Sequence, residues 1–292
     1  MYRKFYNLEV LPFENTSDPR FFYASEQHRE ALAAIEYTIR MRKGIVLVTG
    51  DIGSGKTTIC RTICKRCKDS TTIVQILHGH ETGFELLRHI LRTLGVSLRK
   101  RDDHPRMLQR LQAYLLEQAK INRPVVLFVD EAQTLCDEAL EELRLLTNFD
   151  TETQKLLQVV LVGHPELREQ IRSHKLSALR QRIVMAKRLS PMSRQDTGDY
   201  IVHRIRAASI DPEHSQAGFT PESVQAIYDY TGGVPRLINV ACDNCMLLGF
   251  VRETKQIAPS IVRRVLDDMV PSFEINDWGD SFTPKLSLAG NF

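Results

Sequence analysis

The sequence predicts an α/β fold: a parallel sheet with helices on both faces, followed by a small helical domain. Short apolar runs alternate with segments whose apolar residues recur every three or four positions. That alternation favours parallel strands joined by helices. After Ser190 and Pro191 the strand-like runs stop and only helical patterns continue. We therefore expect three parts: a sheet domain with an aromatic N-terminal segment at 1–190, a helical lid at 191–270 and a tail at 271–292.

Five apolar runs are the expected strands: Ile45–Thr49, Thr72–Leu77, Val125–Val129, Gln158–Val162 and Ile183–Lys187. The run at 125–129 is apolar throughout, as expected of a parallel strand buried on both faces. Helical periodicity predicts helices at 26–40, 83–94, 105–120, 140–149, 194–208, 221–230, 235–250 and 259–269. Thr220 followed by Pro221 is typical of a helix start, with an N-cap and a proline at the first helical position.

The composition is that of a soluble globular protein. Hydrophobic residues make up 42% and charged residues 26% of the 292 positions, both in the ordinary range. The 39 basic and 36 acidic residues leave a net charge of +3, which is too balanced to indicate nucleic-acid binding from bulk charge. No run approaches the ~18 apolar residues of a spanning helix, and the N-terminus lacks a signal-peptide core. We expect a cytoplasmic protein with no direct membrane span.

Residues 50–57 read G-D-I-G-S-G-K-T, the full P-loop pattern, between an apolar run and a helical segment. This context predicts that the backbone N–H groups and the helix N-terminus bind the phosphates of a nucleotide. Lys56 is expected to reach the β- and γ-phosphates, and Thr57 to hold Mg²⁺ through its hydroxyl. The expected nucleotide-binding residues here are Gly50, Asp51, Ile52, Gly53, Ser54, Gly55, Lys56, Thr57 and Thr58.

A second acidic element follows, as a P-loop requires. The apolar run 125–129 ends in Asp130 and Glu131, the pattern of a Walker B strand. Asp130 is expected to bind Mg²⁺, directly or through its water. Glu131 is expected to act as the general base for the attacking water, which favours hydrolysis over transfer to another acceptor.

Three further segments contain candidates for sensing or stabilising the γ-phosphate. His164 follows the next expected strand, where a polar side chain can sense the γ-phosphate; a solvent-facing loop histidine is the alternative. Arg182, with Arg180 as second choice, precedes the last strand and is a candidate arginine finger acting on a neighbouring subunit. Pro235 and Arg236 open a helix after two glycines. A cation is unfavourable at that positive helix end, so a phosphate-facing role would explain Arg236.

In this order, the P-loop, the D-E pair, Q-R-I and G-G-V-P-R-L-I-N resemble the AAA+ ATPases. The stretch F-Y-N-L-E-V-L-P-F-E-N-T-S-D-P-R-F-F-Y-A-S-E-Q-H-R-E-A-L is similar to the start of the general secretion pathway protein A family, as are D-E-A-Q-T-L and L-V-G-H-P-E-L-R-E. The resemblance covers about residues 1–270. It implies an αβα nucleotide domain, a helical lid, and assembly into rings or filaments. ATP would bind between the subunits of such an assembly, and ADP would remain there after hydrolysis. It also places His164 at sensor 1, where many relatives carry glutamine or asparagine, and Arg236 at sensor 2.

Two functions remain open at this stage. Members of that family that serve secretion continue into a transmembrane helix and a peptidoglycan-binding domain, which these 292 residues do not contain. One function is an ATP-driven assembly factor for a secretion or pilus machine, docked to a membrane-bound partner. The other is a regulator of transposition that binds double-stranded DNA and a transposase. The sequence offers two local basic clusters for DNA, at 99–101 and at Lys65, Arg66 and Lys68.

Overall fold

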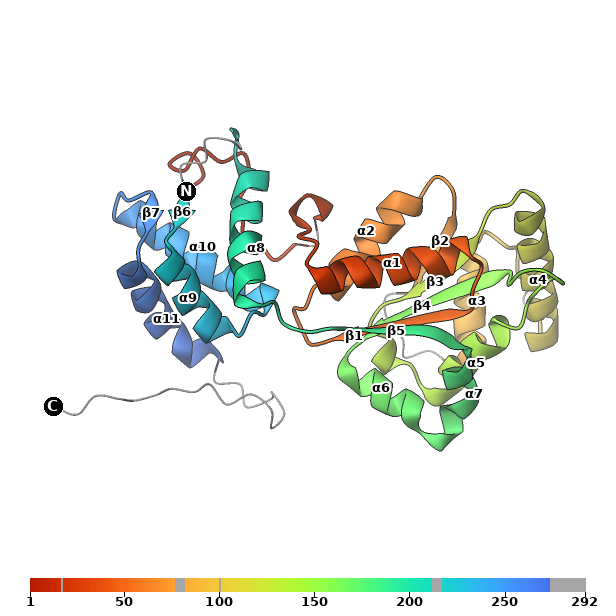
Figure 1. The fold of residues 1–292 in the computed structure, drawn as a ribbon. Helices are drawn as coiled ribbons and strands as arrows, with labels where there is room; N and C mark the ends of the chain where they lie inside the picture. Colours follow the sequence, from red (N-terminus) through yellow and green to blue (C-terminus); the bar gives the residue numbers. More distant parts are fainter. Residues whose placement is uncertain (17, 77–81, 100, 212–216, 274–292) are drawn as a thin grey trace. The chain divides into compact units, whose positions relative to one another are not determined.

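The computed structural model describes residues 1–16, 18–76, 82–99, 101–211 and 217–273 (Figure 1). They form two compact units. The sheet unit is Ser17–Ser190, and the helical unit combines Met1–Thr16 with the described residues after Ser190. Leu77, Lys100 and residues 274–292 of the expected tail lie outside the described residues, whereas 271–273 belong to the last helix.

The sheet unit contains a five-stranded parallel sheet in the order β2-β3-β4-β1-β5. Its strands are β1 (Ile45–Gly50), β2 (Thr72–Ile76), β3 (Val125–Val129), β4 (Leu157–Gly163) and β5 (Ile183–Leu189). All five expected strands are present, and the expected parallel α/β fold is confirmed. Because the strands are parallel, the ends of β1, β3 and β4 that carry the sequence motifs meet at one edge of the sheet.

Helices cover both faces of this sheet (Figure 1). Alternate residues of each central strand point to opposite faces, so Val46 and Val48 face one layer while Ile45 and Leu47 face the other. The first layer contains α1 (Glu26–Arg40) and α2 (Lys56–Cys67). The second contains α3 (Gly83–Thr93), α4 (His104–Lys120), α5 (Asp137–Leu146), α6 (Pro165–Arg172) and α7 (Ser177–Arg182). Short 3-10 helices lie at Pro19–Phe21, Ala132–Thr134 and His174–Leu176.

Two parts of this layer differ from the sequence expectation. Helix α5 begins at Asp137 and ends at Leu146, three residues earlier at each end than expected. Its buried residues include Ala139, Leu140 and Leu143, so the packed face begins before the stretch whose periodicity was most evident. Helices α6 and α7 were not expected, because eight and six residues are too few for a clear helical period.

The helical unit contains α8 (Arg194–Ala208), α9 (Pro221–Thr231), α10 (Pro235–Val251) and α11 (Pro259–Phe273). A two-stranded parallel pair, β6 (Gly218–Phe219) and β7 (Gln256–Ile257), accompanies them. Between α9 and α10, Gly232 and Gly233 have φ angles of 57° and 80°. A Cβ on Gly233 would lie 2.0 Å from the carbonyl oxygen of Met192, so only glycine fits there.

Residues 1–16 belong to the helical unit and not, as expected from the sequence, to the sheet domain. Tyr6 is fully buried and its hydroxyl donates to the carbonyls of Met246 (3.0 Å) and Thr254 (3.2 Å). The buried Arg204 donates to the Glu14 carbonyl at 2.9 Å and also to that of Pro12. These contacts join residues 190 or more positions apart along the chain, so no local sequence pattern could indicate them.

Candidate active site

The P-loop connects β1 to α2 through two left-handed glycines. Gly53 has a φ of 79° and Gly55, the N-cap of α2, a φ of 92°, conformations that L side chains adopt only with strain. Gly50 is needed for a different reason. A Cβ there would lie 2.6 Å from the Ser54 hydroxyl oxygen and 2.9 Å from Leu189. The loop is therefore held against β5 while its backbone turns twice into a conformation that favours glycine.

Lys56 is the first residue of α2 and is buried, with 5% of its surface exposed. Its ammonium donates to the carbonyls of Gly50 (2.8 Å) and Asp51 (3.0 Å), so it is positioned over the loop. Burial lowers the pKa of this ammonium, and the nearby carboxylates of Glu131 and Asp130 partly oppose the shift. The result is a desolvated cation beside the loop, which is the chemistry that phosphate binding requires.

Three other expected nucleotide-binding residues, Ile52, Ser54 and Thr58, differ in exposure and contacts. Ile52 is 48% exposed. The Ser54 hydroxyl is buried with no hydrogen-bond partner among the described residues. Thr58 lies in the first turn of α2 and its carbonyl accepts from the Thr62 hydroxyl at 2.8 Å.

Thr57 and Asp130 join the P-loop to the end of β3. The Thr57 hydroxyl donates to Oδ2 of Asp130 at 2.9 Å, and Oδ1 accepts from the Glu131 N–H at 3.0 Å. A hydroxyl and a carboxylate at this distance offer two oxygen ligands to a metal ion. Mg²⁺ takes one or two protein ligands of this kind and completes its shell with water and phosphate oxygens. The residues therefore fit a Mg²⁺ ion bound together with a nucleotide.

Glu131 is held by a network that the sequence did not indicate. Its backbone is left-handed, with a φ of 54°, a conformation that costs a non-glycine residue energy and is common at functional sites. Nε2 of Gln133 donates to Oε2 of Glu131 at 2.7 Å. Nε2 of His164 lies 3.4 Å from the same oxygen, and the His164 N–H donates to Oε1 of Gln133 at 3.0 Å. Gln133 thus connects the expected base to the end of β4.

A second residue missed by sequence reasoning is His28 on α1. Its side chain is buried beneath the P-loop, with Nε2 3.1 Å from the Ser54 carbonyl and Nδ1 2.6 Å from the Ser25 hydroxyl. A Cβ on Gly55 would lie 2.9 Å from Nε2. The carbonyl can only accept, so Nε2 carries the hydrogen in this contact. The signal available in the sequence was a Ser-x-x-His pattern at the start of α1, which by itself indicates only an N-cap.

The candidate arginine fingers lie at the N-terminal ends of the strands, whereas the P-loop lies at their C-terminal ends. Arg182 ends α7 directly before β5, where Ile183 pairs with Ile45, whereas Gly50 pairs with Leu189. Six residues of strand therefore separate the two places, about 20 Å at 3.3 Å per residue. The exposed Arg180 donates to the Arg172 carbonyl at 3.1 Å. Pro235 and Arg236 open α10 in the helical unit, and Arg236 is exposed.

An AAA domain family matches residues 39–171. General secretion pathway protein A of Aeromonas hydrophila is 37% identical over 257 residues, which cover 88% of this chain and 46% of that protein. An uncharacterised HTH-type transcriptional regulator of Methanocaldococcus jannaschii is 24% identical over 56% of the chain and 39% of its own length. The chain thus spans about half the length, or less, of the curated relatives it matches.

Solved structures share the fold at low sequence identity. The ORC2 protein of Aeropyrum pernix, with ADPNP and ADP, superposes with a TM-score of 0.64 at 16% identity, covering 88% of this chain and 71% of that one. Cdc6p from Pyrobaculum aerophilum gives 0.63 at 19%, covering 88% and 70%. At these identities the likeness concerns the fold alone. Over the residues that the structure describes, no helix is both long and apolar enough to cross a membrane.

Proposed function

Because the chain belongs to the AAA ATPases of the general secretion pathway protein A type, we propose that it binds ATP with Mg²⁺ and hydrolyses it to ADP and phosphate. One observation carries the proposal. The Thr57 hydroxyl and the Asp130 carboxylate meet at 2.9 Å between P-loop and β3, with Glu131 directly beside them. A glycine-rich turn that binds no ligand would not need a metal-binding oxygen pair with a carboxylate base next to it.

In the proposed reaction, a water oxygen attacks the γ-phosphorus while the bond from that phosphorus to the β,γ-bridging oxygen breaks. Glu131 accepts the proton that the water loses. The P-loop backbone and the Lys56 ammonium bind the phosphates and stabilise the charge that develops on the leaving oxygen. Mg²⁺, held by Thr57 and Asp130, would neutralise charge on the phosphate oxygens. Gln133 and His164 orient the base.

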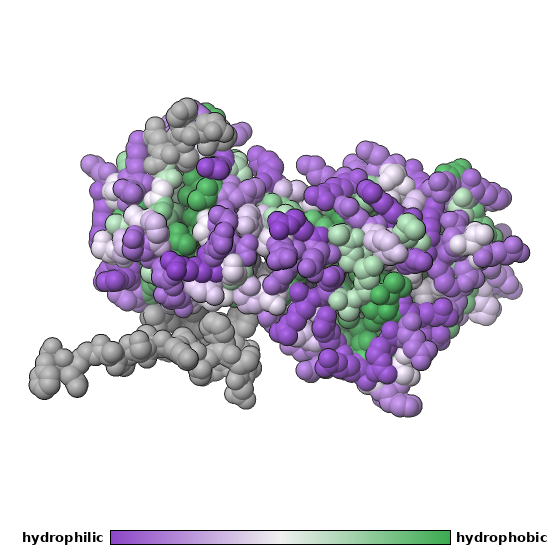
Figure 2. All heavy atoms as spheres, viewed as in Figure 1, coloured by the Kyte–Doolittle hydropathy of each residue, from purple (hydrophilic) through white to green (hydrophobic). Residues whose placement is uncertain are grey.

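We further propose that the active site is completed by a second copy of the chain. About 20 Å of strand separates Arg182 from the P-loop of its own sheet, and this distance supports a role at a neighbour's nucleotide instead of its own. The adjoining strand supports such a contact. β5 is an edge strand, and its residues alternate between half-buried and exposed as far as Arg188, with Val184 48% exposed. Figure 2 shows hydrophobic surface open to solvent on the sheet unit.

The biological role proposed for this cycle is the assembly of a secretion- or pilus-type machine, through contact with a membrane-bound partner. Its support is the relation to general secretion pathway protein A across 88% of the chain. In this role ATP binding between subunits would order a ring or filament, and hydrolysis would reset it. Arg236 at the start of α10 would report the nucleotide state to the helical unit.

The deciding experiment measures phosphate release from ATP against protein concentration, with Mg²⁺ and with the ion removed by chelation. We expect turnover that requires Mg²⁺ and rises more steeply than linearly with protein, because the arginine comes from a neighbour. Strictly proportional turnover would contradict the shared site. No turnover, together with no binding of a fluorescent ATP analogue, would contradict the nucleotide site itself.

A further inference from the structure

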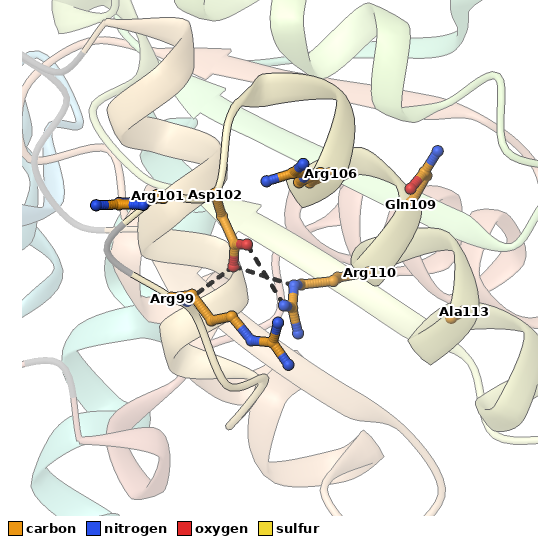
Figure 3. Close-up of a pocket in the computed structure, with 7 residues that line it drawn as sticks. All are labelled: Arg99, Arg101, Asp102, Arg106, Gln109, Arg110 and Ala113. Carbon is orange, nitrogen blue, oxygen red and sulfur yellow. Dashed lines mark hydrogen bonds and ion pairs between the residues drawn. The ribbon is translucent and has the colours of Figure 1, made fainter.

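A pocket of about 790 Å³ lies where the loop before α4 meets the first turns of that helix (Figure 3). It contains none of the residues assigned to the ATP site. Its described lining consists of Arg99, Arg101, Asp102, Arg106, Gln109, Arg110 and Ala113. These residues include no aromatic and no large aliphatic side chain.

The charge of the pocket is concentrated and of one sign. Four arginines accompany a single aspartate in the described lining, an excess of three positive charges. That excess equals the net charge of +3 carried by all 292 residues. Bulk composition therefore conceals a local basic site, of which the sequence showed only the run at 99–101.

Asp102 is used internally and fixes the shape of the pocket. Its side chain is only 4% exposed; Oδ2 accepts from the Arg99 N–H at 2.7 Å and lies 3.1 Å from Nε of Arg110. The Arg99 N–H and then Arg110 lower the pKa of this carboxyl, so it is ionised at neutral pH. Arg110 also donates to the Ser97 carbonyl at 3.1 Å. Figure 3 shows Asp102 between the loop and α4, joined to both by these contacts.

The other three guanidinium groups remain available to a ligand. Within the described ranges, no carboxylate forms an ion pair with Arg99 or Arg101, and both are exposed. Among the described residues, the only carboxylate that pairs with the Arg106 guanidinium is Asp103, at a long 3.9 Å, and the two side chains are 64% and 62% exposed. Ion pairs that exposed contribute little, so Arg106 is free to exchange its partner for another anion.

We propose that this pocket binds the phosphodiester backbone of a nucleic acid. Guanidinium groups pair with phosphate oxygens through two parallel hydrogen bonds. Here they are distributed along a loop and the first turns of α4 instead of converging on one point. That arrangement suits a chain of phosphates better than a single ion. The ATP site is not needed for this contact, so the inference extends beyond the proposed hydrolysis.

The lining disfavours the two other partners that carry negative charge. Membrane-surface binding pairs basic residues with apolar side chains that enter the lipid, and an acidic protein segment would be anchored by aromatic or aliphatic contacts at the centre of the interface. The described lining supplies neither kind of side chain. Contact between basic side chains and phosphates is the mode typical of sequence-independent nucleic-acid binding.

The test is fluorescence anisotropy of a short labelled DNA duplex, and of the same length of single-stranded RNA, with the full chain at several salt concentrations. We expect binding that weakens with salt. The variant Arg99→Ala/Arg101→Ala/Arg106→Ala should bind at least about tenfold more weakly at low salt. A plot of its log affinity against log salt concentration should be less steep by about 2–3 units, because each lost phosphate contact reduces the slope by about 0.9. Binding of a fluorescent ATP analogue should be unchanged, which shows that the variant folds.

The matched control is Lys65→Ala/Arg66→Ala/Lys68→Ala, which removes the same charge at the end of α2, away from this pocket. It should keep nearly all the affinity. An equal loss in both variants would mean diffuse attraction and overturn the proposal, as would no binding to either nucleic acid. Arginine-dependent binding to phosphatidylglycerol vesicles without nucleic-acid binding would assign the pocket to a membrane. Displacement of the duplex by inorganic phosphate, but not by chloride at equal ionic strength, would reduce it to a single-phosphate site.

Discussion

The amide of Gln133 donates to the carboxylate of Glu131 at 2.7 Å, while its oxygen accepts from the backbone N–H of His164 at 3.0 Å. One side chain therefore connects the expected general base at the end of β3 with the sensor position at the end of β4. Gly163 makes room for it, since a Cβ there would lie 2.7 Å from the Gln133 oxygen. We infer that Gln133 fixes the direction of the base and that Gly163 is small so that it can do so.

Removing this positioning contact should slow hydrolysis without weakening nucleotide binding. Gln133→Ala frees the Glu131 carboxylate to rotate, and misplacing a catalytic group by an ångström can cost about 10²-fold. We expect kcat to fall about tenfold to a hundredfold with an unchanged dissociation constant for ATP, measured by steady-state phosphate release and by calorimetry. Gly163→Ala should produce a smaller loss of the same kind. A rise in kcat would show instead that Gln133 restrains the base.

Replacing the base itself should have a larger effect. Glu131→Gln keeps the size and a hydrogen-bonding group but cannot accept a proton from water, so kcat should fall about 10²- to 10⁴-fold. Binding of ATP should persist, and the protein should accumulate in its ATP-bound assembly, visible by size-exclusion chromatography. Glu131→Asp is the control and should retain part of the activity. Hydrolysis by Glu131→Gln at the wild-type rate would refute the assignment of the base.

The Thr57–Asp130 pair predicts a specific metal phenotype. The Thr57 hydroxyl is proposed to bind the metal directly, and even the loss of an outer-shell partner commonly costs ten- to a hundredfold in metal affinity. Thr57→Val should therefore raise the Mg²⁺ concentration for half-maximal turnover at least about tenfold. Thr57→Ser retains the hydroxyl and should stay near the wild type. If excess Mg²⁺ does not increase turnover by Thr57→Val, or if both variants behave alike, the hydroxyl does not hold the metal.

His28 should affect nucleotide affinity through the shape of the P-loop. His28→Ala removes the contact of 3.1 Å with the Ser54 carbonyl, and one hydrogen bond of about 1 kcal/mol corresponds to a fivefold to tenfold weaker binding of ATP. His28→Gln can place an N–H donor at the same point and should restore much of the affinity. A fall in melting temperature in both variants, with ATP binding unaltered, would make His28 a residue of the core only.

The fold followed from the sequence because buried parallel strands are short apolar runs, and five of them stand between helical segments. The Walker residues could also be predicted from the sequence, because Thr57 and Asp130 belong to recognisable motifs. Gln133 and His28 were not, because their roles depend on contacts made only after β3, β4 and α1 pack around the P-loop. The place of residues 1–16 depended likewise on buried partners such as Arg204, far away in the sequence. Helices α6 and α7 could not be predicted because they have too few turns to show a helical periodicity of apolar residues.

The position of Arg182 at the far edge of the sheet leads to a complementation experiment. Arg182→Ala retains a complete P-loop but offers no finger, whereas Lys56→Ala loses the nucleotide yet still presents Arg182. Each variant alone should hydrolyse about 10³-fold or more slowly than the wild type. In an equal mixture, about a quarter of the head-to-tail interfaces combine an intact P-loop with an intact arginine, and turnover should recover to about that fraction of the wild-type rate.

The parallel control mixes Arg180→Ala with Lys56→Ala. Recovery in that mixture, together with full activity of Arg182→Ala alone, would assign the finger to Arg180. No recovery in either mixture, although both pairs co-assemble by size-exclusion chromatography, would mean that no arginine of α7 acts across the interface.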